Sequence, residues 1–193
     1  MFSLYQFLLY IFITAYTPGP NNIMSLSNAV RYGFKKSFPF NLGILAGFSI
    51  VMLFCTLLSA TIFSYIHQAK IYMQVIGAAY MLHLAWKTWK SSPEIELEEA
   101  RGASFTSGLT LQFINPKIYI YAVTAMSTFI LPYFDSSLSL IGFALFLALV
   151  GFTGTVAWSV FGSTFQKILS NYANVVNPIL SVLLLYCAVS LFL

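Results

Sequence analysis

Long apolar runs, separated by short polar interruptions, occupy almost the whole chain. Charged residues are absent from residues 1–30, 37–69, 102–116 and 168–193, and Asp135 is the only one within 118–166. About 20 apolar residues cross the hydrocarbon of a bilayer as an α-helix, so most of these runs are long enough for one or two crossings. The pattern predicts six membrane-spanning helices, at about residues 2–29, 38–65, 71–89, 105–131, 138–164 and 175–193.

Two of the predicted spans contain residues that interrupt a helix. The first span carries Thr17-Pro18-Gly19-Pro20-Asn21-Asn22, and the fourth carries Ile114-Asn115-Pro116-Lys117. Proline removes a backbone donor and clashes with the preceding turn, and glycine between two prolines disfavours regular helix further. In hydrocarbon the freed backbone groups need partners, so a break persists only where it is buried in protein or lines a wet cavity. We therefore predict that the two breaks face each other near the membrane centre and form a solute-binding site.

The positions of the breaks also indicate an internal repeat. Pro18 and Pro116 are 98 residues apart, close to half the chain, and each lies in the first span of a three-span half. An odd number of spans makes the halves enter the membrane from opposite sides, as in transporters with inverted repeats. The predicted fold class is therefore an all-α polytopic membrane protein, with six helices in two inverted three-helix repeats and helices one and four broken. A single transmembrane domain covers residues 1–193, with repeat one at 1–90, a cytoplasmic loop at 91–104 and repeat two at 105–193.

Composition and charge agree with a membrane protein. The chain is 59% hydrophobic and 7% charged, whereas soluble domains carry about 25% charged residues. A net charge of +4 is also compatible with an acidic partner such as nucleic acid, but the nine cations are few and lie mostly at predicted helix ends. We expect no nucleic-acid partner. The expected partners are a small-molecule substrate and membrane lipid, and a homo-oligomer is left open.

The distribution of lysine and arginine predicts the orientation in the membrane. Loops after the predicted odd-numbered spans hold Arg31, Lys35, Lys36, Lys87, Lys90, Arg101 and Lys167. Loops after the even-numbered spans hold only Lys70. Because cytoplasmic loops are enriched in Lys and Arg, this places the odd loops in the cytoplasm and both termini on the periplasmic side.

Lys117 is the residue with the clearest candidate chemistry. It lies about 12 residues, or roughly 18 Å, into the fourth predicted span and so near the bilayer midplane. Placing a lysine there costs about 2.5–3.5 kcal/mol on insertion scales. The alternative is that the side chain snorkels to an interface, but it spans only about half that distance. The candidate roles are attraction of a substrate carboxylate, or proton transfer by an amine whose charged form is disfavoured by burial.

Polar groups beside Lys117 complete the predicted site. The half-helices that follow Pro20 and Pro116 are expected to present unpaired N–H groups and positive dipole ends to a carboxylate. Asparagine side chains can donate and accept, as a zwitterion requires; the alternative for them is capping of the broken backbone. The predicted substrate-binding residues are Pro18, Gly19, Pro20, Asn21, Asn22, Gln112, Asn115, Pro116 and Lys117. His83, Tyr121 and Trp158 are weaker candidates, for which packing is the main alternative.

Several function classes are disfavoured by what the sequence lacks. Enzymatic motifs such as His-Glu-x-x-His or Gly-x-Ser-x-Gly are absent, and Cys55 and Cys187 have no metal-like spacing, so no enzyme, cofactor or metal is expected. The predicted spans contain no Asp or Glu, which disfavours a carboxylate proton relay and a cation channel with an acidic ring. A transporter, a non-transporting assembly subunit and a pore remain. Two breaks at repeat-related positions favour the transporter.

These stretches resemble the lysine exporter superfamily, and within it the homoserine/threonine-exporter branch. The resemblance rests on residues 17–22, on Gly33-Phe34-Lys35-Lys36 and on residues 114–117. Further stretches are most similar to the cysteine/O-acetylserine exporters of that branch: residues 77–80, 84–87, 111–113, 123–132 and 185–189. The resemblance covers nearly the whole chain. It implies efflux of amino acids across the bacterial inner membrane, driven by proton motive force.

The resemblance and the residues together give one hypothesis for function. Exporters of lysine and arginine in this superfamily often carry an acidic residue in a span, and its absence here favours small neutral amino acids, with cysteine and O-acetylserine first. Homoserine and threonine are the alternative substrates. In the expected mechanism the half-helix N–H groups and Lys117 bind the α-carboxylate, and asparagine oxygens receive the α-ammonium. The two halves then rock about close contacts at Gly43, Gly47, Gly151 and Gly154.

Overall fold

The computed structural model describes residues 3–57, 59–90, 103–190 and 192, and the described residues form helices without strands. The helices are α1 (Leu4–Tyr16), α2 (Pro20–Leu57), α3 (Ser59–Trp89), α4 (Phe105–Ile114), α5 (Pro116–Thr124), the π-helix η2 (Ala125–Ile130), α6 (Ser137–Thr164), α7 (Gln166–Asn171) and α8 (Ala173–Ser190). The predicted all-helical class is confirmed. Most of the predicted polar loop 91–104, including its glutamates, lies outside the described residues.

Both predicted helix breaks are present. Helix α1 ends at Tyr16, Thr17 has an extended backbone (φ −66°, ψ 149°), and α2 begins at Pro20. Asn115, also extended (φ −92°, ψ 100°), separates α4 from α5, which begins at Pro116. Proline fits the first position of a helix because the N–H that it lacks would have no intrahelical acceptor there. The same prolines that end one helix therefore start the next.

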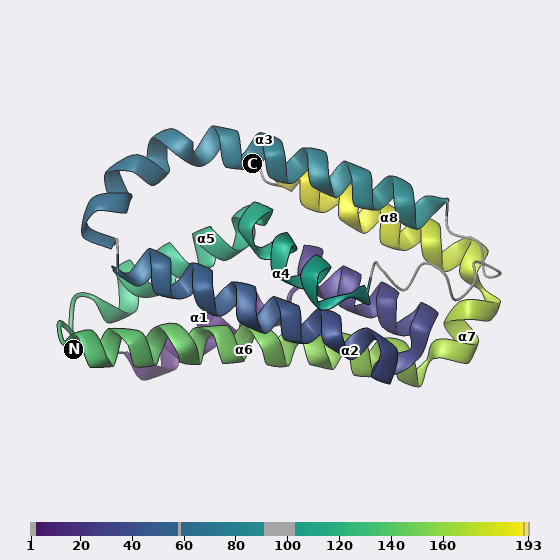
Figure 1. The fold of residues 1–193 in the computed structure, drawn as a ribbon, viewed down its shortest axis with the longest axis horizontal. Helices are drawn as coiled ribbons and strands as arrows, with labels where there is room; N and C mark the ends of the chain where they lie inside the picture. The colour runs from purple at the N-terminus through teal and green to yellow at the C-terminus, as the bar shows by residue number, and fades with distance from the viewer. Residues whose placement is uncertain (1–2, 58, 91–102, 191, 193) are drawn as a thin grey trace.

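A single glycine makes the turn that was predicted to be a loop after residue 29. Gly33 has φ 76° and ψ 166°, a backbone region that favours glycine, while helical structure continues on both sides of it. The Ser25 hydroxyl donates to Asn41 Oδ1 over 2.7 Å, and these residues lie equally far before and after Gly33. The two arms of α2, residues 20–32 and 34–57, therefore fold back against each other (Figure 1).

One boundary and the geometry of one helical stretch differ from the sequence prediction. The boundary between the predicted second and third spans, 38–65 and 71–89, comes earlier than expected, because α2 ends at Leu57 and α3 runs from Ser59 to Trp89. Residues 66–70 contain no glycine or proline, so nothing in them stops a helix, and a lone lysine does not require a loop. Beyond α5, the chain leaves α-geometry in η2, where the Leu131 N–H donates to Met126 O over 2.8 Å.

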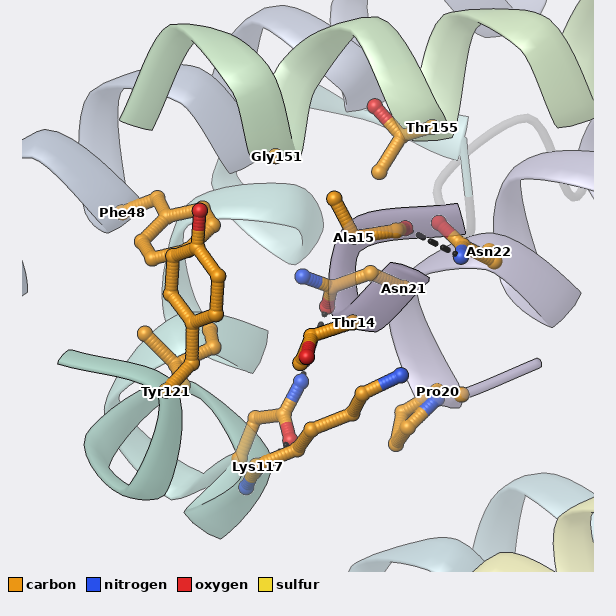
Figure 2. Close-up of a pocket in the computed structure, with 13 residues that line it drawn as sticks. Thr14, Ala15, Pro20, Asn21, Asn22, Phe48, Lys117, Tyr121, Gly151 and Thr155 are labelled. Carbon is orange, nitrogen blue, oxygen red and sulfur yellow. Dashed lines mark hydrogen bonds between the residues drawn. The ribbon is translucent and has the colours of Figure 1, made fainter. Parts of the chain in front are cut away.

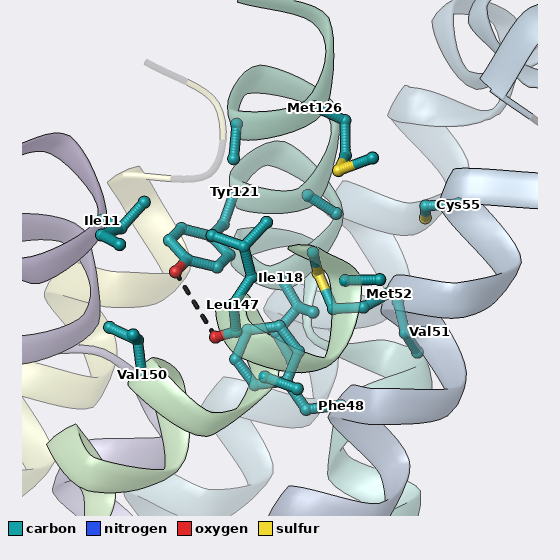
Figure 3. Close-up of a cluster of buried hydrophobic side chains, with 14 of the residues drawn as sticks. Ile11, Phe48, Val51, Met52, Cys55, Ile118, Tyr121, Met126, Leu147 and Val150 are labelled. Atoms are coloured by element: carbon teal, nitrogen blue, oxygen red, sulfur yellow. Dashed lines mark hydrogen bonds between the residues drawn. The ribbon is translucent and has the colours of Figure 1, made fainter. Parts of the chain in front are cut away.

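The helices pack in two groups that meet at α2 and α4. Helix α2 packs most extensively on α6 and α4, and α3 packs on α8. In Figure 1, α3 and α8 lie along one edge, α2 and α6 along the other, and α4 and α5 between them. One apolar cluster joins α1, α2, α5, η2 and α6, and it includes Ile11, Phe48, Tyr121 and Leu147 (Figure 3). A second cluster joins α2, α3, α4 and α8.

The close contacts predicted at small residues are confirmed. A Cβ atom at Gly43 would overlap the backbone of Phe105, and one at Gly47 would lie 2.7 Å from Leu109 O, so α2 and α4 approach at backbone distance. Gly151 accommodates the ring of Phe48, and a Cβ at Gly154 would lie 2.6 Å from Ala15 O.

Membrane-crossing potential is clearest for two of the described helices. Pro20–Thr56 and Ser137–Thr164 are long and apolar enough to cross a bilayer by length and composition. The first of these ranges contains the Gly33 turn, so it comprises two shorter arms.

Candidate functional site

A small cavity lies between the two helix breaks. Its volume is about 40 Å³, enough for a few water molecules. It is lined by Thr14, Ala15, Gly19, Pro20, Asn21, Asn22, Phe48, Asn115, Lys117, Ile118, Tyr121, Gly151 and Thr155. Figure 2 shows Phe48 and Tyr121 on one side and Lys117 and Pro20 on the other. The breaks therefore meet at one cavity, as predicted.

Lys117 joins the second break to the first. Its ammonium donates to Thr17 O (3.2 Å), Thr17 Oγ1 (3.1 Å) and Pro18 O (3.4 Å). The side chain extends from α5 toward the start of α2 (Figure 2), so its ammonium is held at the first break. These carbonyls follow the C-terminus of α1, where the helix dipole is negative, so the ammonium is attracted there. A Cβ atom at Gly19 would lie 2.9 Å from Nζ, and glycine thus leaves room for the ammonium.

The carbonyl groups left free at the end of α1 are satisfied by side chains. Asn22 Nδ2 donates to Ala15 O and to Thr17 O, both at 2.8 Å. The indole N–H of Trp158 donates to Tyr16 O over 3.1 Å. This is the requirement for broken backbone in a low-dielectric setting. Asn22 therefore caps the broken backbone, which was the alternative role for the asparagines. Trp158 has the same capping role and is not among the residues that line the cavity.

Three carboxamides connect the two breaks. Asn21 Nδ2 donates to Gln112 Oε1 (2.8 Å), and Gln112 Nε2 donates back to Asn21 Oδ1 (3.2 Å). Asn115 Nδ2 donates to the same Asn21 oxygen over 3.1 Å. Gln112 and Asn115 are 0% and 1% exposed, so this network is shielded from competing water. It links α2 directly to α4 and to the break before α5.

The two half-helix N-termini differ, which corrects the prediction that both present unpaired N–H groups. At α5, the Lys117 N–H donates to Asn115 Oδ1 (3.1 Å) and the Ile118 N–H to Asn115 O (3.2 Å). Local capping by Asn115 thus satisfies that end. At α2 the first bond of the helix runs from the Ile23 N–H to Gly19 O (2.9 Å). The N–H groups of Asn21 and Asn22 precede that bond, and both residues line the cavity.

Three of the nine predicted site residues do not line the cavity. Pro18 contributes its carbonyl to Lys117, and Gln112 holds Asn21 from outside the cavity. Pro116 packs against α3, where a Cβ atom at Gly77 would lie 2.7 Å from its Cδ. The other six line it: Gly19, Pro20, Asn21, Asn22, Asn115 and Lys117.

The sequence did not identify the apolar wall of the cavity, apart from Tyr121. Phe48 comes from the second arm of α2, and its ring packs against Tyr121 with 5.7 Å between centroids. Gly151 permits this position, because a Cβ atom there would overlap the Phe48 ring. Thr155, which is 1% exposed, lies one turn further along α6. The wall makes the cavity polar and cationic on one side and aromatic on the other, an arrangement that suits a small carboxylate with an uncharged side chain.

Comparison with known proteins agrees with this chemistry. Residues 12–193 match the protein family described as LysE type translocator. The chain is 41% identical over 184 residues to a cysteine/O-acetylserine efflux protein of Escherichia coli strain K12, covering 95% of this chain and 94% of that protein. A protein of the same name from Shigella flexneri serotype 5b shows the same identity and coverage. No solved structure matches the chain.

Proposed function

Because the chain belongs to the LysE type translocator family, we propose that it exports small neutral amino acids across the bacterial inner membrane, with cysteine and O-acetylserine as favoured substrates. Family membership makes the chain a membrane transporter and not an enzyme, and it disfavours the assembly-subunit alternative. The substrate choice is supported by relatives that are named for cysteine and O-acetylserine efflux and that align over 95% of the chain.

The observation that carries the proposal is the Lys117 ammonium at a cavity where both breaks meet. The described lining residues include this cation and no acidic residue, so the cavity attracts an anionic group. A substrate carboxylate would accept hydrogen bonds from Lys117 and from the N–H groups of Asn21 and Asn22 at the positive end of the α2 dipole. Helix α5, whose first N–H groups are capped, contributes Lys117 rather than its backbone.

Binding of the substrate ammonium is proposed to involve an exchange. When Lys117 turns toward the carboxylate, it releases the carbonyls of Thr17 and Pro18 that it now contacts. The α-ammonium of the substrate then replaces the lysine ammonium at these oxygens, beside the carboxamide oxygens of Asn21 and Asn115. The exchange keeps one positive charge at the end of α1, so the carbonyl groups of the break have a hydrogen-bond donor before and after it.

The proposed transport cycle uses the two inverted three-helix halves. With about 40 Å³, the cavity must widen to hold an amino acid. We propose that the halves rock about the α2–α4 contact and open the site alternately to the two sides, with both termini periplasmic. Proton motive force is the proposed driving force. Because the described helices contain no Asp or Glu, and Asp135 lies between η2 and α6, the proton would be carried by Lys117, His83, water or the substrate.

Uptake into everted inner-membrane vesicles tests this function. Vesicles from cells that produce the protein are energised and given labelled L-cysteine, O-acetyl-L-serine, L-homoserine, L-threonine or L-lysine. We expect saturable, protein-dependent accumulation of the first two, which a protonophore abolishes. A preference for homoserine and threonine would support the alternative substrates instead. Flux that rises without saturation would indicate a pore, and no protein-dependent uptake of any of the five would refute the proposal.

Phe48→Ala is expected to broaden the substrate range toward larger side chains. The Phe48 ring forms the aromatic wall with Tyr121, and its removal enlarges the cavity away from Lys117 and the amides. Because one methylene is worth about 1–3 kcal/mol of discrimination in an apolar pocket, we expect the ratio of leucine to cysteine transport to rise by about tenfold or more. Uptake of labelled L-leucine and of labelled L-cysteine into the same vesicles measures this ratio. An unchanged ratio would mean that the wall does not contact the substrate side chain.

A further inference from the structure

A second, larger cavity lies between α2, α3 and α4. It has a volume of about 230 Å³, and its polar lining residues include Ser27, Asn28, Arg31, Tyr80, His83 and Ser107. Ser27 and Asn28 are each 4% exposed. Polar side chains between helices of a membrane protein are tolerated where they line a wet space, and a cavity of this volume holds many waters. His83, a weaker candidate from the sequence, lines this cavity and not the central one.

One cationic side chain, Arg31, lines this cavity. Arg31 supplies a guanidinium, and the described residues that line the cavity include no Asp or Glu. A guanidinium binds a carboxylate through two parallel N–H bonds, which fixes the orientation of the ligand as well as its charge. The neutral oxygens of Ser27, Asn28 and Ser107 can accept from an ammonium group. The lining therefore offers complementary groups to both ends of a zwitterionic amino acid.

Helices α2 and α4 carry lining residues of the second cavity close to residues of the central site. Met24, which lines it, lies one helical turn after Asn21 on α2, and Leu111, which also lines it, directly precedes Gln112 on α4. Asn21 itself lines the central cavity, and its reciprocal hydrogen bonds with Gln112 therefore involve residues close in sequence to the lining of both cavities. The apolar neighbours of the amide pair are buried, since Leu111 is 1% exposed and Ile23 is 0% exposed.

We propose that the second cavity is a vestibule in which the carboxylate of a zwitterionic amino acid binds Arg31 before it passes the Asn21–Gln112 pair into the central cavity. This inference rests on the proposed function, which places Arg31 on the cytoplasmic side. The amide pair opens when its members bond to the passing substrate instead of to each other. Export then begins with capture of cytoplasmic substrate in the vestibule. The vestibule is separate from the central cavity, which the rocking halves open alternately to the two sides.

Equilibrium binding tests the vestibule. The full chain is reconstituted in phosphatidylcholine nanodiscs and titrated with labelled L-cysteine under a phosphine reductant. Lys117→Met removes the cation of the central site, so binding that remains reports the vestibule. We expect saturable binding to persist in Lys117→Met, and Arg31→Gln in that background to weaken it by about tenfold or more, as loss of a charge-assisted hydrogen bond predicts. Arg31→Lys should restore part of the affinity.

Lys35→Gln is the matched control, because it removes the same charge from an exposed side chain on the other arm of α2, just beyond the Gly33 turn. It should change the affinity by less than about twofold. The vestibule would be overturned if Arg31→Gln left the affinity of the Lys117→Met protein unchanged, or if the Lys117→Met protein bound no cysteine at all. The vestibule would also be overturned if Arg31 were required for binding of phosphatidylglycerol but not for binding of cysteine. Vesicle uptake by the unmodified protein separates the two proposals: uptake with Arg31-independent binding refutes only the vestibule, and absent uptake refutes the proposed function.

Discussion

Lys117→Met is expected to abolish export while the protein still inserts into the membrane. Methionine has a similar length but no charge, so the carboxylate loses its cation and the carbonyls of Thr17 and Pro18 lose their donor. Hydrogen bonds to charged groups are worth about 1.5–3 kcal/mol each, and a tenfold change corresponds to about 1.4 kcal/mol, so we expect at least a 100-fold loss, about two such bonds. Cysteine uptake into everted vesicles, normalised to the amount of protein in the membrane, measures it.

Lys35→Met provides the control for loss of one positive charge. Lys35 is exposed beyond the Gly33 turn, so its removal should leave uptake within about twofold of the unmodified protein. Gly19→Ala offers a milder test of the same geometry, since the added methyl group would displace the Lys117 ammonium without removing it. Full transport by a well-inserted Lys117→Met protein would show that the ammonium serves only the backbone of the break.

The breaks were predictable because their cause is local. Proline and glycine disfavour a helix wherever they stand, and hydrocarbon makes an unsatisfied break costly, so the sequence alone indicated that residues 17–22 and 114–117 face each other. The Gly33 turn has an equally local cause, but glycines are common in membrane helices, and nothing in the sequence distinguishes this one from those used for packing. The α2–α3 boundary was missed because no residue near it marks an end.

The roles of individual residues within the site were less predictable, because they depend on the direction in which each side chain points. Asn21 and Asn22 are neighbours with the same chemistry, yet successive helical residues point about 100° apart. Asn21 therefore meets Gln112 of α4, whereas Asn22 turns back to cap α1. Phe48 had no sequence signal at all, since aromatic residues make up 18% of the chain and only the contact with Gly151 distinguishes it. Local chemistry located the site, and tertiary packing assigned its parts.

Gly43→Ala is expected to destabilise the protein strongly, since α2 and α4 cross there at backbone distance. An added Cβ would overlap Phe105 O and lie 2.9 Å from Leu109 N, and backbone atoms cannot move aside as a side chain can. Overpacking of this kind costs about 1–3 kcal/mol, and we expect the upper end, with a fall in the melting temperature of about 5–10 °C. Heating in detergent followed by size-exclusion chromatography of the remaining folded protein measures the shift.

Gly142→Ala is the matched control, because it makes the same substitution in a helix where no described atom lies within 4 Å of the new methyl group. Its melting temperature should stay the same or rise slightly, since alanine is favoured over glycine in a helix by about 0.5–1 kcal/mol. If both variants melted alike, the close approach of α2 and α4 would be wrong. This crossing joins the two halves of the chain, so a protein that keeps its fold but loses the contact should also lose transport. The rocking motion proposed for export would in that case depend on the same backbone contact that stabilises the fold.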